Sequence, residues 1–215
     1  MSRVLVKVCG VTEERDAIDA ALLGVDALGL HFSADSPRRI DPEDARRIVE
    51  RLPAFVAKVG VFAGDPIIRV LEIARKVGLT AIQLDGDETP SFCESLRPIA
   101  WYKTLRVDPG FTSDAFEGYA CTTFLLDWSR AGGAPGQAGI PGWRHARAFA
   151  VHGRILISGG LDSGNVEAAI AEARPYGVDA TSGVEFVPGK LNLDRLEDFI
   201  AAVRRAEHLL SDSNR

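Results

Sequence analysis

The chain has too few cysteines for a covalently stapled or zinc-built fold. Only three of its 215 residues are cysteines, and they lie far apart: Cys9, Cys93 and Cys121. This odd, scattered set predicts neither a disulfide framework nor a zinc knuckle, and it fits a reducing cytoplasm. The histidines show no metal-ligand spacing, so we expect no metal site. We interpret all four as structural or exposed: His31, His145, His152 and His208.

Basic clusters and long apolar runs are also missing. The 25 lysines and arginines are outnumbered by 30 acidic residues, which gives a net charge of −5. A nucleic-acid binder needs a basic stripe that displaces phosphate counterions, so that class is excluded. No apolar run could span a bilayer and the N-terminus shows no signal segment, which predicts a soluble, cytoplasmic protein without membrane partners.

Short apolar runs rich in β-branched residues recur throughout the chain. Eight of them lie at residues 4–8, 27–32, 55–62, 79–84, 99–105, 122–126, 154–157 and 177–180. Runs of this length that are bounded by turn-forming residues are typical of buried strands.

Segments with helical periodicity separate these runs. Asp41-Pro42 begins one of them, with the aspartate as the cap and the proline in the first turn, and Asp65-Pro66 repeats the pattern. Gly78 is placed to end the second helix in a left-handed conformation. A C-terminal helix is predicted by an apolar stripe: Leu193, Leu196, Ile200 and Val203.

The alternation of strands and helices predicts parallel strands joined by crossover helices. Units of roughly 27 residues favour a closed (β/α)8 TIM barrel, which needs about 200 to 250 residues in all. We therefore expect an α/β protein with a single barrel domain over residues 1–210 and a disordered tail at 211–215. A flavodoxin-like or Rossmann sheet is the alternative, and the Gly/Pro-rich stretch 131–142 is predicted to be a mobile loop.

The active site of such a barrel gathers at the carboxyl ends of the strands. The first run ends in K-V-C-G-V-T at 7–12, and period-two alternation places Lys7 and Cys9 on one face. An ammonium group beside Cys9 would favour the thiolate that a cysteine base requires. The alternative is that Cys9 is an inert buried side chain.

Charged residues follow two other runs. The sixth run ends in Asp127, a position suited to a general acid or base and equally to a helix cap or loop residue. Arg38 follows the second run after Ser36-Pro37, where a rigid turn could hold it as a bidentate clamp for a carboxylate. For Arg38 and the adjacent Arg39, solvated surface is the alternative.

Loops of small residues follow the last two runs. S-G-G-L-D at 158–162 and T-S-G-V-E at 181–185 let backbone N–H groups approach a phosphate. A tight turn would explain the glycines of one such loop. Two of them, in the two places where barrel phosphate sites recur, predict a phosphate site built mostly from amides.

In this order, the motifs resemble the phosphoribosylanthranilate isomerase family of tryptophan biosynthesis over almost the whole chain. K-V-C-G-V-T at 7–12 resembles the family's K-x-C-G-x-T, while S-P-R at 36–38 and V-G-V-F at 59–62 match its segments. Q-L-D-G at 83–86 stands where the family has Q-L-H-G, and L-L-D at 125–127 and S-G-G-L at 158–161 resemble its L-L-D and A-G-G-L. V-D-A-T-S-G-V-E at 178–185, followed by P-G at 188–189, resembles its V-D-x-S-S-G-V-E and P-G.

The resemblance implies an Amadori rearrangement of a phosphoribosyl aryl amine, without a cofactor, in a barrel of the ribulose-phosphate-binding type. Asp127 would be the general acid, Cys9 the general base, and Arg38 would hold the aryl carboxylate. The residues implied to hold the phosphate are Gly159, Gly160, Ser182 and Gly183. The remaining substrate contacts are expected from Lys7, Gln83, Asp85 and Asp179. The partner would be a phosphorylated small molecule, and the chain a monomer or homodimer.

Two departures from the family pattern lie where the aryl half should bind. Asp85 replaces the histidine of Q-L-H-G, and the stretch 132–139 is longer than the family's G-G-x-G. The Asp85 carboxylate would repel an aryl carboxylate by about 1 kcal/mol at about 4 Å in water, so we expect Arg38 or another nearby cation to compensate. Two alternatives stay open: a related isomerase for another phosphoribosyl amine, and a non-catalytic phosphate-ligand binder.

Overall fold

The barrel closes through pairing of its first and last strands. The structure, a computed structural model, describes residues 3–129 and 142–212. Eight parallel strands follow one another in chain order, and β1 also pairs with β8. The strands are β1 (Leu5–Cys9), β2 (Ala27–His31), β3 (Ala57–Phe62), β4 (Ala81–Leu84), β5 (Ala100–Arg106), β6 (Thr123–Asp127), β7 (Arg154–Ser158) and β8 (Gly177–Ala180). This closure confirms the predicted (β/α)8 barrel and excludes the open Rossmann or flavodoxin-like sheet.

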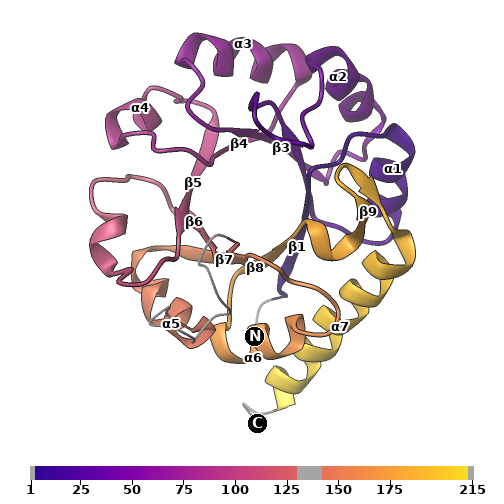
Figure 1. Cartoon of the computed structure of the whole chain (residues 1–215), viewed down its shortest axis with the longest axis vertical. Helices are drawn as coiled ribbons and strands as arrows, with labels where there is room; N and C mark the ends of the chain where they lie inside the picture. Colours follow the sequence, from indigo (N-terminus) through magenta and orange to yellow (C-terminus); the bar gives the residue numbers. More distant parts are fainter. Residues whose placement is uncertain (1–2, 130–141, 213–215) are drawn as a thin grey trace.

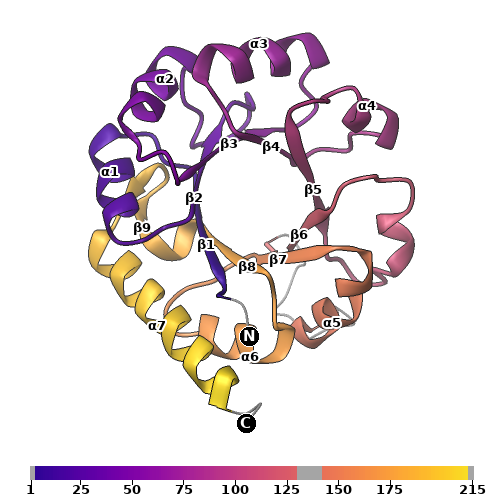
Figure 2. The ribbon, with the colours of Figure 1, turned by 180° about the vertical axis from the view of Figure 1, so that it is seen from behind.

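Helices surround the ring of strands, as the two opposite views in Figures 1 and 2 show. The α-helices are α1 (Glu14–Leu22), α2 (Pro42–Arg51), α3 (Ile67–Val77), α4 (Pro90–Glu94), α5 (Trp143–Ala148), α6 (Val166–Ala173) and α7 (Leu193–Asp212). Shorter elements are the 3-10 turns η1 (Ser113–Phe116), η2 (Phe149–His152) and η3 (Ser182–Val184), and the hairpin strands β9 (Glu185–Val187) and β10 (Lys190–Leu191). Within the described ranges, no helix combines the length and apolar character needed to cross a membrane.

The expected ends of the helices are mostly confirmed. Asp41 caps α2 by accepting a hydrogen bond from the Glu43 amide at 2.8 Å. Asp65 does not cap α3, because Pro66 itself takes the cap position and Asp65 instead pairs with Arg69 at 2.9 Å. Gly78 ends α3 with φ of 77°, the left-handed conformation expected of it.

The last helix ends two residues later than predicted, since the disordered tail was expected to begin at residue 211. The apolar stripe of α7 is present, but the helix continues to Asp212, and the Ser211 hydroxyl donates to the Glu207 carbonyl at 2.8 Å. Residues 213–215 lie outside the described part of the chain, as do residues 131–141 of the expected mobile loop.

Strand alternation divides the buried side chains into two layers. One set packs between the strands and the helices, and includes Phe32, Phe62, Phe124 and Phe199. The other set fills the interior of the barrel: Val59, Tyr102, Leu125 and Leu156, with the small residues Ala27, Ala57 and Ala81 beside them. This filled interior closes the barrel below the carboxyl ends of the strands, so a ligand can enter only at the rim.

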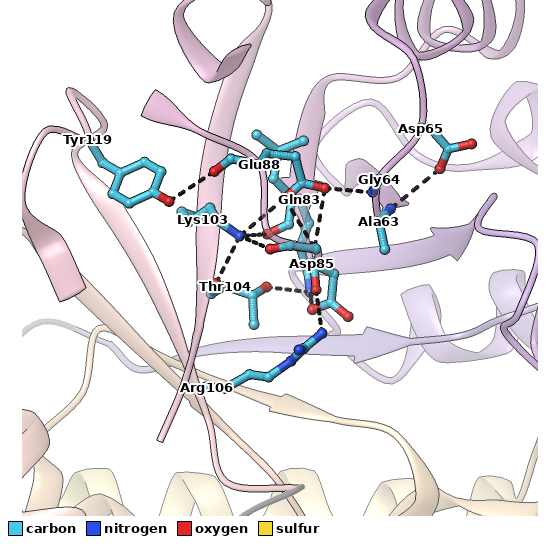
Figure 3. Close-up of polar contacts among 12 residues, drawn as sticks. Ala63, Gly64, Asp65, Gln83, Asp85, Glu88, Lys103, Thr104, Arg106 and Tyr119 are labelled. Atoms are coloured by element: carbon cyan, nitrogen blue, oxygen red, sulfur yellow. Dashed lines mark hydrogen bonds and ion pairs between the residues drawn. The ribbon is translucent and has the colours of Figure 1, made fainter. Parts of the chain in front are cut away.

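A buried lysine fixes the loop that follows β4 (Figure 3). The Lys103 ammonium on β5 donates to Glu88 Oε2 at 3.2 Å and to three backbone carbonyls, those of Leu84, Gly86 and Thr104. The other Glu88 oxygen accepts from the Gly64 amide in the β3–α3 loop at 2.9 Å. Both charged side chains are only 3% exposed, so the pair joins the loops after β3 and β4 to strand β5 and fixes the backbone on either side of Asp85.

We predict that Lys103→Met destabilises the fold by about 3–5 kcal/mol, because it leaves the Glu88 carboxylate buried without its cation. Urea unfolding measures this directly. Lys190→Ala is the matched control, since Lys190 also pairs with one glutamate, Glu13, but at an exposed site, and we expect no measurable change there. Equal stability of the Lys103→Met variant and the original protein would contradict the role given to this pair.

Candidate active site

One pocket at the carboxyl ends of the strands brings together most of the predicted site residues. The predicted residues that line it are Cys9, Arg38, Gln83, Asp85, Asp127, Gly159, Gly160, Asp179 and Ser182. Two predicted residues lie behind this lining: Lys7 and Gly183. The lining residues that the sequence analysis did not predict as individual site residues are His31, Leu125, Ser129, Ser158 and Thr181.

Lys7 and Asp179 form an ion pair at the floor of the pocket. The Lys7 ammonium lies 2.8 Å from Asp179 Oδ2, and the two side chains are 3% and 2% exposed. Burial alone would lower the pKa of Lys7, but Asp179, Cys9 and Tyr102 together more than offset this, so the pKa is raised and the lysine stays charged. The second carboxylate oxygen, Asp179 Oδ1, is buried and has no hydrogen-bond partner among the described residues.

Cys9 is a neutral thiol in the absence of a ligand. Burial raises the pKa of Cys9 to about 12; Lys7 opposes this shift, and Asp179 reinforces it. Lys7 thus favours the thiolate, as expected, but burial outweighs it, and the Asp179 carboxylate offsets part of the effect of Lys7 at the sulfur.

His31 lies against the thiol, although the sequence analysis treated it as structural or exposed. Its Nε2 is 3.3 Å from Cys9 Sγ, and its partly buried ring lines the pocket. Strand alternation could have found it: Gly29 pairs in register with Cys9, and His31 is two residues further along the same face of β2.

Asp127 ends β6 and lines the pocket beside Ser129. Both of its oxygens accept hydrogen bonds from Ser129: Oδ1 from the amide at 2.9 Å and Oδ2 from the hydroxyl at 2.6 Å. These two contacts fix the rotamer of a partly exposed carboxyl group at the strand end, which a proton donor to a bound ligand requires.

Arg38 is already engaged by a carboxylate of the protein. Its Nε donates to Glu185 Oε1 at 2.8 Å and its Nη2 to Oε2 at 2.6 Å, which occupies one edge of the guanidinium. Gly10 permits this position, since a Cβ there would lie 2.2 Å from Arg38 Cδ. The edge formed by Nη1 and Nη2 remains for an anion, so a bidentate clamp is possible only through that edge.

Asp85 is not compensated by Arg38. Its carboxylate accepts a 3.4 Å contact from the Gln83 amide group, and the nearby cation is Arg106, whose Nη2 donates to the Asp85 carbonyl at 3.2 Å. Figure 3 shows Arg106 directed at Asp85 from β5. Gln83 is itself fixed by the Tyr102 hydroxyl at 2.9 Å and by Thr104 at 3.1 Å.

The two glycine-containing loops touch each other. A Cβ on Gly183 would lie 2.1 Å from the Leu161 carbonyl oxygen, and one on Gly159 would lie 2.6 Å from the Trp128 and Ser129 amide nitrogens. By contrast, Gly160, with φ of 68°, faces open space. In the described chain, the amides of Gly160, Ser182 and Gly183 donate to no protein acceptor, so they are available to an anion.

A thiol, a carboxyl group and a two-loop anion site at one end of a closed barrel define a (β/α)8-barrel enzyme that handles a phosphorylated ligand. The family model of N-(5'-phosphoribosyl)anthranilate isomerase matches residues 6–202 of this chain. The chain belongs to that family.

Relatives of known name cover nearly the whole chain. The N-(5'-phosphoribosyl)anthranilate isomerase of Pelobacter propionicus is 38% identical over 99% of this chain and 100% of its own length. The crystal structure of the Thermotoga maritima phosphoribosyl anthranilate isomerase is 36% identical, with a TM-score of 0.86 over 94% of this chain and 99% of its own. A further structure of such an isomerase, in complex with reduced 1-(o-carboxyphenylamino)-1-deoxyribulose 5-phosphate, is 34% identical, with a TM-score of 0.81 over 94% and 99%.

We predict that Gly183→Ala weakens binding of inorganic phosphate at least about tenfold, because the added methyl group forces the two loops apart. Titration calorimetry with phosphate measures the effect. Gly110→Ala is the control, since Gly110 lies outside the pocket and no atom lies within 4 Å of an added Cβ there, although its φ of 89° is strained for alanine. Unchanged affinity in Gly183→Ala would show that the loops do not form the anion site together.

Proposed function

We propose that this chain catalyses the Amadori rearrangement of N-(5'-phosphoribosyl)anthranilate to the aminodeoxyribulose phosphate, a step of tryptophan biosynthesis. The observation that carries the proposal is the presence of Cys9 and Asp127 in one pocket with the two phosphate loops. Family membership and the ligand of the 34% identical structure support the same substrate class.

The reaction needs one acid and one base. Asp127 protonates the ribose ring oxygen, the ring opens, and the nitrogen lone pair forms a Schiff base. Cys9, as thiolate, then removes the proton from the adjacent sugar carbon, and the resulting enolamine becomes the ketose. One proton is donated and one removed, so the substrate is isomerised without a redox partner.

Binding groups surround these two residues. The amides of Gly160, Ser182 and Gly183 bind the phosphate, while the free Nη edge of Arg38 holds the anthranilate carboxylate. Asp179 Oδ1, buried and unpartnered in the described chain, accepts a hydrogen bond from a sugar hydroxyl. Lys7, Gln83 and Gly159 act by holding Asp179, Asp85 and the loop geometry in place.

The site requires only one copy of the chain, since all of these residues come from it, and it works in either a monomer or a homodimer. Cys9 must be a free thiol, as it is here. A reducing compartment such as the cytoplasm therefore suits the activity.

We predict that the gene complements a tryptophan auxotroph lacking this isomerase, and that Cys9→Ser and Asp127→Asn variants do not. Each substitution should lower kcat on the order of 10²–10⁴-fold, with KM within about tenfold, because only the proton transfers are lost. Cys121→Ser is the control, because Cys121 lies outside the pocket. Near-normal turnover by Cys9→Ala would refute the base assignment.

Asp85→His should leave turnover of phosphoribosylanthranilate within about tenfold, because the guanidinium of Arg106, which donates to the Asp85 carbonyl, is near enough to offset part of the repulsion between the Asp85 and substrate carboxylates. Steady-state kinetics of the two proteins tests this, with the exposed loop variant Asp87→His as the control. If Asp85→His instead created activity that the original chain lacks, the substrate would be another phosphoribosyl amine.

A further inference from the structure

The proposed mechanism requires Cys9 to lose its proton, and few side chains near the thiol could accept it. Lys7 and Tyr102 are near the thiol but are themselves protonated, and Asp179 is bound to Lys7. In the part of the chain that the structure describes, the one side chain in hydrogen-bond contact with Cys9 that can accept a proton is His31, at 3.3 Å.

We infer that His31 takes the proton of the Cys9 thiol and thereby generates the thiolate that removes the proton from the sugar carbon. His31 is then a positioning and activating residue, since it acts through Cys9 and not on the substrate itself. The inference rests on the proposed function and assigns a role to a residue that the family motifs quoted above do not contain.

The absence of a side chain at Gly29 allows the contact between Cys9 and His31. Cys9 pairs in register with Gly29, and a Cβ on Gly29 would lie 2.6 Å from Cys9 Sγ and 3.1 Å from Lys7 Nζ. The missing side chain gives the sulfur room to lie against β2, directly below the ring of His31. On the same face of β2, Gly29 thus leaves space for the Cys9 sulfur and His31 contacts it.

Forming the two charges together is less unfavourable than forming either one alone. Burial lowers the pKa of His31 to about 4 and raises that of Cys9 to about 12, because each single charge is poorly solvated there. An imidazolium and a thiolate formed together at 3.3 Å carry no net charge and attract each other, so this penalty is partly offset.

The charged groups around the pair act in opposite directions on its two members. Lys7 favours the thiolate and disfavours the imidazolium, while Asp85 does the reverse. Arg38 also disfavours the imidazolium, but Glu185 neutralises it. These opposing effects leave the direct contact between Nε2 and Sγ as the deciding interaction.

The protons balance over one turnover. The thiol proton moves to His31 Nε2, Asp127 gives its proton to the ring oxygen, and the thiolate regains a proton from the substrate carbon. The imidazolium then releases its proton to water, and Asp127 takes one from water. Every group returns to its starting state, and no co-reactant is needed.

Alkylation of Cys9 by iodoacetamide tests this step without substrate. Mass spectrometry of the Cys9 peptide measures the alkylation rate. In the original protein, this rate should be nearly independent of pH across the neutral range. In His31→Asn it should rise about tenfold per pH unit, because only solvent then removes the proton. His208→Asn is the matched control, since His208 is exposed on α7, and its profile should stay flat.

Turnover provides the second measurement. His31→Asn should lower kcat at neutral pH about 10²-fold or more with KM within about threefold. In His31→Ala, added imidazole should restore kcat in proportion to its concentration, which a purely structural role of His31 would not allow. Circular dichroism and Tm confirm folding, and His31→Gln serves as a second variant.

Two outcomes overturn the inference: the same pH profile of alkylation in His31→Asn as in the original protein, or no rescue of a folded His31→Ala variant by imidazole. Neither affects the proposed function, which fails separately if the original protein does not turn over phosphoribosylanthranilate.

Discussion

The buried ion pair between Lys7 and Asp179 links the closure of the barrel to the geometry of its active site. The two residues face each other in register on β1 and β8, the strands whose pairing completes the ring. Removing either partner would leave the other charge buried and unpaired, which would lower the free energy of unfolding by about 3–5 kcal/mol. Cys9 lies two residues beyond Lys7, and the phosphate loop begins two residues beyond Asp179. The pair thus sets the position of the base relative to the phosphate.

Burial keeps the Cys9 thiol protonated in spite of the neighbouring ion pair. It is the largest effect on the pKa of Cys9 and raises it to about 12, while Lys7 lowers this pKa and Asp179 raises it. Activation must therefore come from a neighbour that can accept a proton, which is the role we give to His31. Keeping the thiol neutral between turnovers also limits its oxidation, because the thiolate is the reactive form.

Two arginines lie near the pocket, on different elements. Arg38 forms an ion pair with Glu185, while Arg106 donates to the backbone carbonyl of Asp85. The ion pair holds the guanidinium of Arg38 in one orientation, which lowers the entropy lost when it binds a carboxylate. In the function we propose, these two cations lie close enough to lessen the repulsion between Asp85 and the substrate carboxylate.

Local patterns in the sequence were enough to predict the barrel, its strands, and most of the residues that line the pocket, including Cys9 and Asp127. Strand periodicity and glycine placement depend on neighbours in sequence, and the active-site end of a barrel follows from its topology. The partners of charged residues were not predictable: Glu185 for Arg38, Asp179 for Lys7, and His31 for Cys9. Those contacts join residues from different strands and loops, so only closure of the barrel decides which charges meet and what pKa values they adopt.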